Sequence, residues 1–559
     1  MKKLIRCFPL FLLFLIACRQ EPAFHIVNPG SMPFTWDNAS IYFLLTDRFN
    51  NGIPENDHLH NEEVIPGPLR GFKGGDIVGI TQKIKEGYFD RLGVDAIWLT
   101  PIVRQIDGWV DEGTGISFPF HGYWTKDWTS IDPRFGTEKD LMELVSVAHS
   151  HKIRILLDVV ANHTGPVTPE DPKWPESWVR TGPVCTYRGF HTTTHCTLVE
   201  NLPDIRTESF EEVELPLHLI EKWKEEGRYD QEVLELNQWF LETGYPRTPV
   251  YHILKWLVDF VKKYGIDGFR VDTVKHTEPY VWNDLWISAS KAFEEWKKTH
   301  EAESIDDTPF YMVGEVYGYY IGSGRSYDFG DTLVDYFSNG FHALINFDFK
   351  YDAGGTWEAM FSKYDSLLHE PLVGKSVVNY ISSHDDGRPF DLFREKPIES
   401  GTRLMLCPGA IQIYYGDETA RTLTAEAVGD ASLRSYMNWD ELDNNTQKAD
   451  GTTHEILTHW QKLGTFRKNH PSVGTGKHMQ IYDDPYTFSR TYSDGDKSDQ
   501  VVIALDVPLG EKTIVVDPIF KNKMTLRDAY SGHLSKVIQG TVSLDTPYSI
   551  VLLEKFEQN

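Results

Sequence analysis

Short apolar runs alternate with longer amphipathic segments along most of the chain from residue 41 onward. The apolar runs have the length of buried strands and end in polar residues, whereas the amphipathic segments have the spacing of helices. Eight runs of this kind predict eight strands. We expect them at residues 41–46, 96–100, 154–160, 268–272, 310–315, 344–349, 377–382 and 411–415.

Eight strands joined by helical crossovers predict an α/β fold, a (β/α)₈ TIM barrel, at residues 38–161 and 246–470. The intervening residues 162–245 are too many for an ordinary loop and predict a protruding subdomain after the third strand. This subdomain includes a helical insertion at residues 211–243. Beyond the barrel, short alternating runs predict a C-terminal antiparallel β-sandwich at residues 471–559.

The N-terminus has the pattern of an export signal. Basic residues precede an apolar run at residues 8–17 that is too short to span a bilayer. The run ends in Leu-Ile-Ala-Cys and resembles a bacterial lipobox, which predicts removal of residues 1–17 and lipidation of Cys18. The alternative is an ordinary secretory signal with an incidental cysteine. Both readings predict export, and the first predicts a membrane-anchored lipoprotein at the cell surface or the periplasmic face.

The net charge of −27 argues against nucleic acid or an anionic membrane surface as a direct partner, because both require a basic patch. A lipid anchor is therefore the only membrane contact that we expect, and a neutral substrate suits the charge better. The 16 Trp and 26 Tyr residues suit stacking on sugar rings, although an aromatic-rich core explains most of them equally well.

The cysteines fit an exported chain, in which disulfides are permitted. Cys185 and Cys196 are close enough in sequence to close a small loop, and we expect a disulfide between them. Cys407 is left over, and we expect it to be a buried thiol.

The fourth predicted strand ends in Gly-Phe-Arg-Val-Asp, which places Arg270 and Asp272 on one face. A neighbouring cation lowers the pKa of a carboxylate and keeps it ionised, as a nucleophile requires; the alternative is a structural ion pair. Glu315 ends the fifth strand, roughly 5 Å from Asp272 if the strands are neighbours, which is the spacing of a retaining glycosidase. Burial beside other carboxylates, with Asp385 as the third, would raise the pKa of Glu315 and let it hold a proton.

Four ordered motifs follow the predicted strands. They are Asp158-Val159-Val160-Ala161-Asn162-His163, Gly268 to Asp272 continuing through Thr273-Val274-Lys275-His276, Gly314-Glu315-Val316, and His384-Asp385. His121-Gly122-Tyr123-Trp124 and Ile413-Tyr414-Tyr415-Gly416-Asp417-Glu418 accompany them. Together these motifs resemble the alpha-amylase family of glycoside hydrolases over roughly residues 40–470.

The resemblance implies a role for several residues. It implies Asp272 as the nucleophile, Glu315 as the general acid and base, and Asp385 as the residue that fixes the sugar and stabilises the oxocarbenium-like transition state. The residues implied around the reacting glucose are Arg270, His163, His384 and Tyr123, with Tyr123 stacked on the ring. Family members usually have Asn where this chain has Ser383, a difference that concerns local hydrogen bonding.

The resemblance also implies Ca²⁺ as a cofactor at two places rich in oxygen ligands. One resembles the calcium loop near the first strand of cyclodextrin glucanotransferases, with a polar turn as the alternative. Its residues are Asn51, Ile53, Asn56, Asp57, Gly74 and Asp76. The other is the more widespread family site, formed by Asn162, Asp204 and the carbonyl of His276, which clamps the protruding subdomain to the barrel.

Specificity is predicted from fewer residues. Lys275 and His276 resemble enzymes that bind glucose on the leaving-group side through α-1,4 linkages, which favours endo-acting hydrolysis of starch and maltodextrins. The single sandwich, without the further domains of cyclodextrin glucanotransferases, favours hydrolysis over cyclisation. The alternatives are a cyclomaltodextrin-degrading, maltogenic or transglycosylating relative and, from another class, an inactive glucan-binding scaffold.

Overall fold

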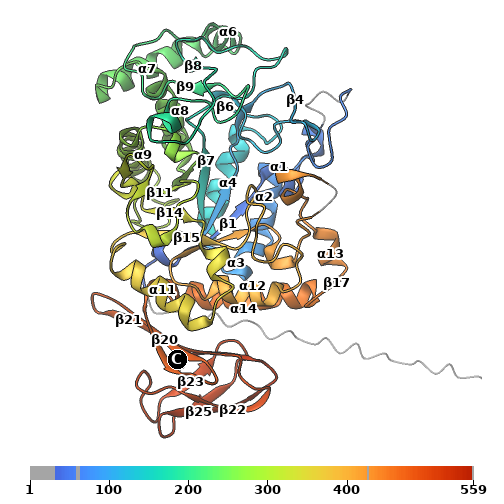
Figure 1. Ribbon diagram of the computed structural model, residues 1–559, viewed down its shortest axis with the longest axis vertical. Helices are drawn as coiled ribbons and strands as arrows, with labels where there is room; N and C mark the ends of the chain where they lie inside the picture. The colour runs from blue at the N-terminus through green and yellow to red at the C-terminus, as the bar shows by residue number, and fades with distance from the viewer. Residues whose placement is uncertain (1–31, 58–62, 425–426, 557–559) are drawn as a thin grey trace, which may run out of the picture.

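The computed structural model describes residues 32–57, 63–424 and 427–556, and its centre is a closed barrel of eight parallel strands (Figure 1). The strands, in barrel order along the chain, are β1 (Ser40–Leu44), β2 (Ala96–Leu99), β7 (Arg154–Val159), β10 (Gly268–Val271), β11 (Tyr311–Gly314), β14 (Ala343–Asn346), β15 (Ser376–Tyr380) and β16 (Ala410–Tyr414). Every residue in them is buried. Burial on both faces explains why they read as continuous apolar runs, and the predicted TIM barrel is confirmed.

Helices surround the barrel and connect its strands. The principal ones are α2 (Ile77–Lys85), α3 (Tyr88–Leu92), α4 (Glu138–Ser150), α8 (Pro249–Tyr264), α9 (Pro279–Thr299), α11 (Trp357–His369), α12 (Pro397–Met405) and α14 (Thr453–Asn469). Helix α8 begins with a proline at its first position and ends at Gly265, whose φ of 71° favours glycine. A Cβ at Gly265 would lie 2.2 Å from the Trp296 ring, so this glycine also lets α9 pack against α8.

The predicted insertion leaves the barrel between β7 and α8 and lies at the end of the molecule shown at the top of Figure 1. Its elements are β8 (Val179–Arg180), α5 (His191–Thr194), β9 (Asp204–Ile205), α6 (Leu217–Glu225) and α7 (Tyr229–Thr243). Apolar contacts fix its helices on α8, since Trp223 meets Trp256 and Phe240 meets His252. The predicted disulfide closes the loop around α5.

The C-terminal domain occupies the opposite end, at the bottom of Figure 1, and consists of two antiparallel sheets. A six-stranded sheet contains β19 (Lys477–Tyr482), β20 (Thr487–Asp494), β21 (Lys497–Leu505), β23 (Thr525–Asp528), β24 (Leu534–Lys536) and β26 (Ile550–Lys555), and a two-stranded sheet contains β22 (Gly510–Val515) and β25 (Thr541–Thr546). Apolar residues of both sheets share a separate core, as in a sandwich.

A buried ion-paired histidine joins this domain to the barrel. His470, which directly follows α14, contacts Asp499 at 2.8 Å through Nδ1 and Glu554 at 2.7 Å through Nε2. Burial alone would lower the pKa of His470, but the two carboxylates outweigh it and raise that pKa to about 9. The imidazolium therefore holds strands β21 and β26 against the end of α14.

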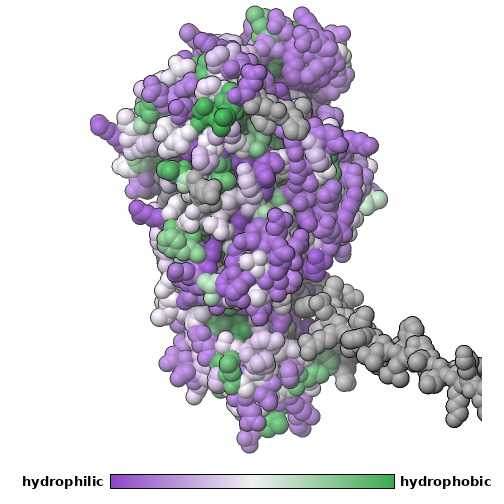
Figure 2. Space-filling view, turned by 90° about the vertical axis from the view of Figure 1, so that its right-hand side faces the viewer, coloured by the Kyte–Doolittle hydropathy of each residue, from purple (hydrophilic) through white to green (hydrophobic). Residues whose placement is uncertain are grey.

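Short elements complete the fold: α1 (Thr46–Phe49), β3 (Val103–Gln105), β4 (Val110–Asp111), β5 (Ile116–Ser117), β6 (Thr125–Ile131), β12 (Tyr327–Asp328), β13 (Leu333–Val334), α10 (Phe349–Asp352), α13 (Trp439–Asp443), β17 (Gln447–Lys448), β18 (Gly451–Thr452) and α15 (Ser472–Thr475). The face in Figure 2 is mostly hydrophilic, with apolar residues in small scattered groups. Among the described residues, no helix is long and apolar enough to cross a membrane. The predicted signal peptide and Cys18 lie outside the described residues.

Candidate active site

Arg270 is the centre of the charged cluster at the carboxyl ends of the barrel strands. Its side chain is 1% exposed, and Nη1 donates to both oxygens of Asp158, at 2.9 and 3.0 Å, and to Asp272 Oδ1 at 2.7 Å. Nη2 lies 3.8 Å from Glu315 Oε2. A single planar guanidinium therefore orients three carboxylates from three adjacent strands. The predicted placement of Arg270 and Asp272 on one face is confirmed.

Asp158 belongs to a motif that the sequence analysis recognised, but its contacts were not predicted. Besides the two bonds from Arg270, Asp158 Oδ2 accepts hydrogen bonds from Trp98 Nε1 at 3.0 Å and from the Tyr123 hydroxyl at 2.8 Å. Its carboxylate is fully enclosed by these donors, which leaves it no room to act on a substrate. Asp158 therefore holds Arg270 and Tyr123 in position.

Asp272 directly follows β10 and continues its parallel pairing. The register joins Val271 to Gly314, so Asp272 and Glu315 are the next residues on adjacent strands, which run about 4.8 Å apart. The backbone N–H of Asp272 donates to the carbonyl of Val159 at 3.0 Å. This register is the basis of the predicted closeness of the two carboxylates.

Glu315 has the environment of a carboxyl group that retains its proton. Burial raises the pKa of Glu315 to about 8, and Asp272 and Asp385 act in the same direction against the opposing Arg270. Its Oε2 accepts the N–H of Thr273 at 2.9 Å. Thr273 has a φ of 50°, a conformation that costs a non-glycine residue energy and that presents this N–H to Glu315. The pKa is shifted in the direction that the sequence predicted.

Asp385 is the most exposed of the cluster's carboxylates. The exposed fraction of the side chain is 0% for Asp158, 7% for Glu315, 11% for Asp272 and 31% for Asp385, so the cluster opens to solvent on the Asp385 side. The Ser383 hydroxyl lies 3.4 Å from Asp385 Oδ1. The serine that departs from the family pattern is thus within reach of the predicted third carboxylate.

Three predicted substrate-binding side chains form an ordered aromatic group. The rings of Tyr123 and His384 stack with centroids 5.3 Å apart, and His163 Nε2 contacts the Tyr123 carbonyl at 3.2 Å. Burial lowers the pKa of both histidines, so each is a neutral hydrogen-bonding group. Tyr123 is also tied to Asp158 through its hydroxyl, which fixes the plane of its ring.

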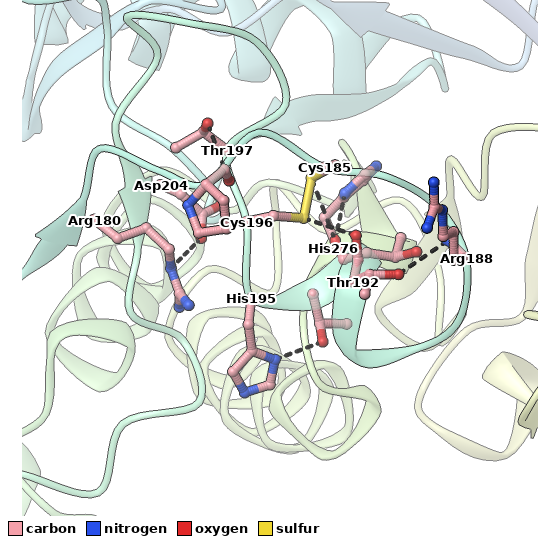
Figure 3. Close-up of a disulfide and its surroundings, with 12 residues drawn as sticks. Arg180, Cys185, Arg188, Thr192, His195, Cys196, Thr197, Asp204 and His276 are labelled. Carbon is pink, nitrogen blue, oxygen red and sulfur yellow. Dashed lines mark hydrogen bonds and ion pairs between the residues drawn. A yellow bond between two sulfur atoms is a disulfide. The ribbon is translucent and has the colours of Figure 1, made fainter.

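Lys275 and His276, also predicted to bind substrate, face the insertion. Lys275 Nζ donates to the Tyr317 carbonyl at 3.0 Å and to the Tyr327 hydroxyl at 3.2 Å, and it lies 5.5 Å from the Tyr187 ring centroid. His276 Nδ1 contacts the Thr193 carbonyl at 2.9 Å, within the disulfide-closed loop (Figure 3). Burial lowers the pKa of His276 to about 4, so it connects the loop to the barrel as a neutral ring.

A second ion pair next to Asp385 was not predicted. Lys350, in the short helix after β14, pairs with Asp386, which also accepts a hydrogen bond from the Tyr380 hydroxyl at 2.6 Å. Burial lowers the pKa of Lys350 to about 8, although Asp385 opposes the shift. The pair anchors the chain segment that carries His384 and Asp385.

Most of the predicted calcium residues near β1 come together. Asn51 Nδ2 lies 2.9 Å from both Asp57 oxygens, and a Cβ at Gly74 would lie 2.2 Å from Asp57 Oδ1. Among the described residues, Asn56 Oδ1 is buried without a hydrogen-bond partner. Asp57 and Asn56 therefore supply carboxylate and amide oxygens of the kind that a hard cation binds.

The other two residues of this predicted site have structural contacts. Asp76 caps helix α2 by accepting the N–H of Gly79 at 2.6 Å, and it also accepts the N–H groups of Gly52 and Ile53. The Ile53 carbonyl accepts the Asn56 N–H at 3.3 Å. Asp76 and Ile53 therefore fix the conformation of this loop through hydrogen bonds.

The second predicted calcium site shows buried oxygen atoms that lack partners. Both side-chain polar atoms of Asn162 and Oδ1 of Asp204 are buried without a hydrogen-bond partner, while Asp204 Oδ2 lies 2.9 Å from Arg180 Nε. Burial raises the pKa of Asp204. Unpaired buried oxygens are costly unless something fills the space between them, so Asn162 and Asp204 fit a cation. His276, whose carbonyl is the third predicted ligand, ends the short 3-10 turn Val274–His276 that follows β10.

The barrel, the position of the carboxylates at the ends of neighbouring strands and the raised pKa of Glu315 define the class of protein as a glycoside hydrolase. The sequence-family model of the alpha amylase catalytic domain matches residues 43–476, and the chain belongs to the alpha-amylase family. It is 35% identical to the periplasmic alpha-amylase of Escherichia coli over 526 residues, which cover 83% of this chain and 72% of that protein.

Solved structures show the same fold. The alpha-amylase of Geobacillus thermoleovorans, crystallised with acarbose, has a TM-score of 0.63 at 21% identity and covers 94% of this chain and 100% of its own. A cyclomaltodextrin glucanotransferase with a three-domain ABC distribution also has a TM-score of 0.63 at 21% identity, covering 93% and 99%. Both structures share the fold of this chain, and the predicted preference for hydrolysis over cyclisation stays a prediction.

Proposed function

We propose that this protein hydrolyses internal α-1,4-glucosidic bonds of starch and maltodextrins with retention of configuration. The observation that carries the proposal is the pairing of Asp272 with a buried Glu315 whose pKa is raised to about 8, on adjacent strands and around one guanidinium. This gives one carboxylate suited to attack and one carboxyl suited to donate a proton.

In the first step the Asp272 carboxylate attacks the anomeric carbon while Glu315 gives its proton to the glycosidic oxygen. The C–O bond to the leaving chain breaks, and an ester to Asp272 forms. In the second step Glu315 takes a proton from water, the resulting hydroxyl adds to the anomeric carbon, and Asp272 is released. Asp385 holds the sugar hydroxyls in both steps, and Arg270 orients Asp272 through its hydrogen bond to Oδ1.

The experiment that tests this mechanism reads the anomer of the new reducing end. Early-time proton NMR of maltooligosaccharide hydrolysis should show the α-anomer first, because two displacements at one carbon restore its configuration. If the β-anomer appears first, a water molecule attacks directly and the pairing of Asp272 with Glu315 is wrong. Asp272→Asn is the control, since it should form neither anomer at a comparable rate.

The endo action on α-1,4 bonds is supported by the surroundings of Lys275. Its ammonium and the rings of Tyr187, Tyr317 and Tyr327 lie together on the side of Glu315 that faces the insertion, where a leaving glucan chain would stack. The resemblance to a periplasmic alpha-amylase points the same way.

The alternative activity is cyclomaltodextrin degradation, maltose formation or transglycosylation. Chromatography of products from soluble starch, short maltodextrins and cyclomaltodextrins separates these activities: a broad set of linear products from starch supports the endo reading. Faster turnover of cyclomaltodextrins than of starch would contradict it. Complete absence of turnover would leave only the inactive glucan-binding scaffold.

We further propose Ca²⁺ at the two places where the residues fit it. Asn162, Asp204 and the His276 carbonyl would hold one ion, and Asn51, Asn56, Asp57 and the Gly74 loop would hold the other, with Ile53 and Asp76 in support. The ions would neutralise buried carboxylates and fix the loops that carry them.

The N-terminal motif supports export and lipidation at Cys18, after removal of residues 1–17. The Cys18→Ser variant should move from the membrane fraction to the soluble fraction of expressing cells, because the acylated thiol is the proposed anchor. An unchanged distribution between the two fractions would contradict the lipoprotein assignment and leave an ordinary secretory signal.

A further inference from the structure

A group of three metal-binding side chains lies at the junction of the insertion and the barrel, and the proposed mechanism does not use it. His195 directly follows α5, Glu208 follows β9, and Glu278 directly precedes α9. One ligand atom of each lies within 4.8 Å of the others. Two elements of the insertion and one of the barrel therefore meet at this point.

The hydrogen bonding of His195 leaves one ring nitrogen bare. His195 Nδ1 lies 2.8 Å from the Thr194 hydroxyl, and that hydroxyl donates its only proton to the Phe190 carbonyl at 3.1 Å. Thr194 must then accept a hydrogen from Nδ1, so the neutral ring carries its proton there. Figure 3 shows the ring of His195 beside the disulfide-closed loop.

The bare nitrogen faces a buried oxygen that also lacks a partner. Glu278 is 8% exposed, and its Oε2 accepts the Thr207 hydroxyl at 2.9 Å. Its Oε1 is buried without a hydrogen-bond partner and lies 3.9 Å from His195 Nε2. The distance is too long for a shared proton, so His195 Nε2 and Glu278 Oε1 are two separate ligand atoms 3.9 Å apart.

The charge at this junction favours a cation. Arg180 is the counter-charge, and its guanidinium is already shared between Asp204, at 2.9 Å, and Glu208. Among the described residues, no lysine or arginine lies within ion-pair distance of Glu278, whose Oε2 accepts the Thr207 hydroxyl. Asp204, Glu208 and Glu278 thus have one guanidinium near them, and the junction retains an excess of negative charge.

The donor types select the kind of metal. Calcium takes oxygen ligands, whereas an imidazole nitrogen with two carboxylate oxygens is a donor set of zinc and related ions. Metal–nitrogen and metal–oxygen bonds of about 2.0–2.2 Å placed end to end span roughly 4.2 Å. The separation of 3.9 Å between His195 Nε2 and Glu278 Oε1 accommodates such an ion.

We propose that His195 Nε2, Glu208 and Glu278 Oε1 bind a divalent transition-metal ion of the zinc type. This site is separate from the calcium position at Asn162 and Asp204. Occupancy clamps the insertion to the start of α9, and therefore to the turn that follows the strand of Asp272. Thr194 acts as the positioning residue, because it fixes the tautomer of the His195 ring.

The test uses the full chain stripped with chelator and then saturated with Ca²⁺. Calorimetric titration with Zn²⁺ should give one site per chain, and Co²⁺ should develop visible absorption bands at the same stoichiometry. The affinity should fall at least about tenfold in His195→Asn and in Glu278→Gln, and by a similar or smaller factor in Thr194→Val. Circular dichroism and the stabilisation by Ca²⁺ should stay unchanged.

His151→Asn is the matched control, since this histidine also has a carboxylate partner and its side chain is 30% exposed, against 26% for His195. Zn²⁺ affinity that is unchanged in both His195→Asn and Glu278→Gln would overturn the proposal. An equal loss in the His151 variant would also overturn it, because binding would then belong to surface histidines. If Glu278→Gln fails to fold, the Zn²⁺ affinity of His195→Asn alone tests the proposal, since the His195 side chain is partly exposed.

Discussion

Two groups of buried carboxyl and amide oxygens in this protein are satisfied in opposite ways. At the strand ends, Asp158 and Asp272 both accept hydrogen bonds from Arg270. Asp158 also accepts hydrogen bonds from Trp98 and Tyr123. At the junction with the insertion, polar atoms of Asn162, Asp204 and Glu278 are buried without hydrogen-bond partners.

The difference shows which group of oxygens has its hydrogen-bond partners within the chain. The strand-end group is oriented by its own side chains, so its geometry exists before any ligand arrives, as preorganised electrostatic catalysis requires. The junction carries buried oxygens without hydrogen-bond partners among the described residues, and these are the atoms that the proposed cations would contact. Charge changes in the first group should therefore affect the rate, and those in the second should affect stability.

The largest expected effect is in the strand-end group. Asp272→Asn should lower kcat on a maltooligosaccharide by several powers of ten, because the amide cannot form the covalent intermediate. Its melting temperature should remain close to that of the wild type, since Arg270 keeps Asp158 as a partner. Asp307→Asn, an exposed carboxylate, is the control and should be silent. Activity within about tenfold of wild type would remove Asp272 from the nucleophile role.

Arg270→Lys sharpens the comparison, because it keeps the charge and removes the planar fork. One ammonium cannot reproduce the contacts to Asp158, Asp272 and Glu315 together. We expect kcat to fall by about 10²–10³-fold, a typical loss for a preorganised electrostatic contact. Steady-state kinetics measure this, and a variant within threefold of wild type would show that charge alone organises the cluster.

The pH dependence should follow Glu315. As the general acid it must be protonated, so kcat/KM should fall as pH rises through about 8, the value to which burial raises its pKa. Glu315→Gln should lose this basic limb when assayed on a maltosyl fluoride, whose leaving group needs no proton. Retention of the same limb in that variant would assign the titration to another group.

The smallest expected effect concerns the junction. Removing Ca²⁺ should lower the melting temperature by a few degrees, because an ion that binds only the folded state stabilises it by about 2.7 kcal/mol at one hundred times its dissociation constant. Asp204→Asn should reduce this response to added Ca²⁺, whereas Asp272→Asn should leave it intact. Identical melting curves with EDTA and with millimolar Ca²⁺, in a protein purified free of calcium, would contradict both proposed calcium sites.

The barrel could be predicted because its strands are buried on both faces and therefore leave long apolar runs. The run at residues 344–349 was extended too far, since Phe349 is buried at the start of α10 and reads like a strand residue. The Arg270–Asp272 contact followed from the two-residue period of a strand. In these cases local spacing determines the outcome.

Other contacts depend on side chains that converge from distant segments, which spacing does not encode. Trp98 and Tyr123 reach Asp158 from positions 60 and 35 residues away in the chain. Lys350, in α10 after β14, meets Asp386, which follows β15, and a single lysine in the sequence gives no sign of such a partner. The lack of a hydrogen-bond partner for Glu278 Oε1 can be recognised only when the positions of the neighbouring donors are known.

The exposure of the carboxylates rises in one direction, from Asp158 through Glu315 and Asp272 to Asp385. In the proposed mechanism, water and a second sugar would reach the ester at Asp272 from the Asp385 side, where the cluster is most exposed. Water and the second sugar would compete for the same ester. The share of each product would depend on how long the departing chain stays bound and on the concentration of free sugar. Dilute glucan should then yield shortened chains by hydrolysis, whereas concentrated glucan should yield an increasing share of transglycosylation products.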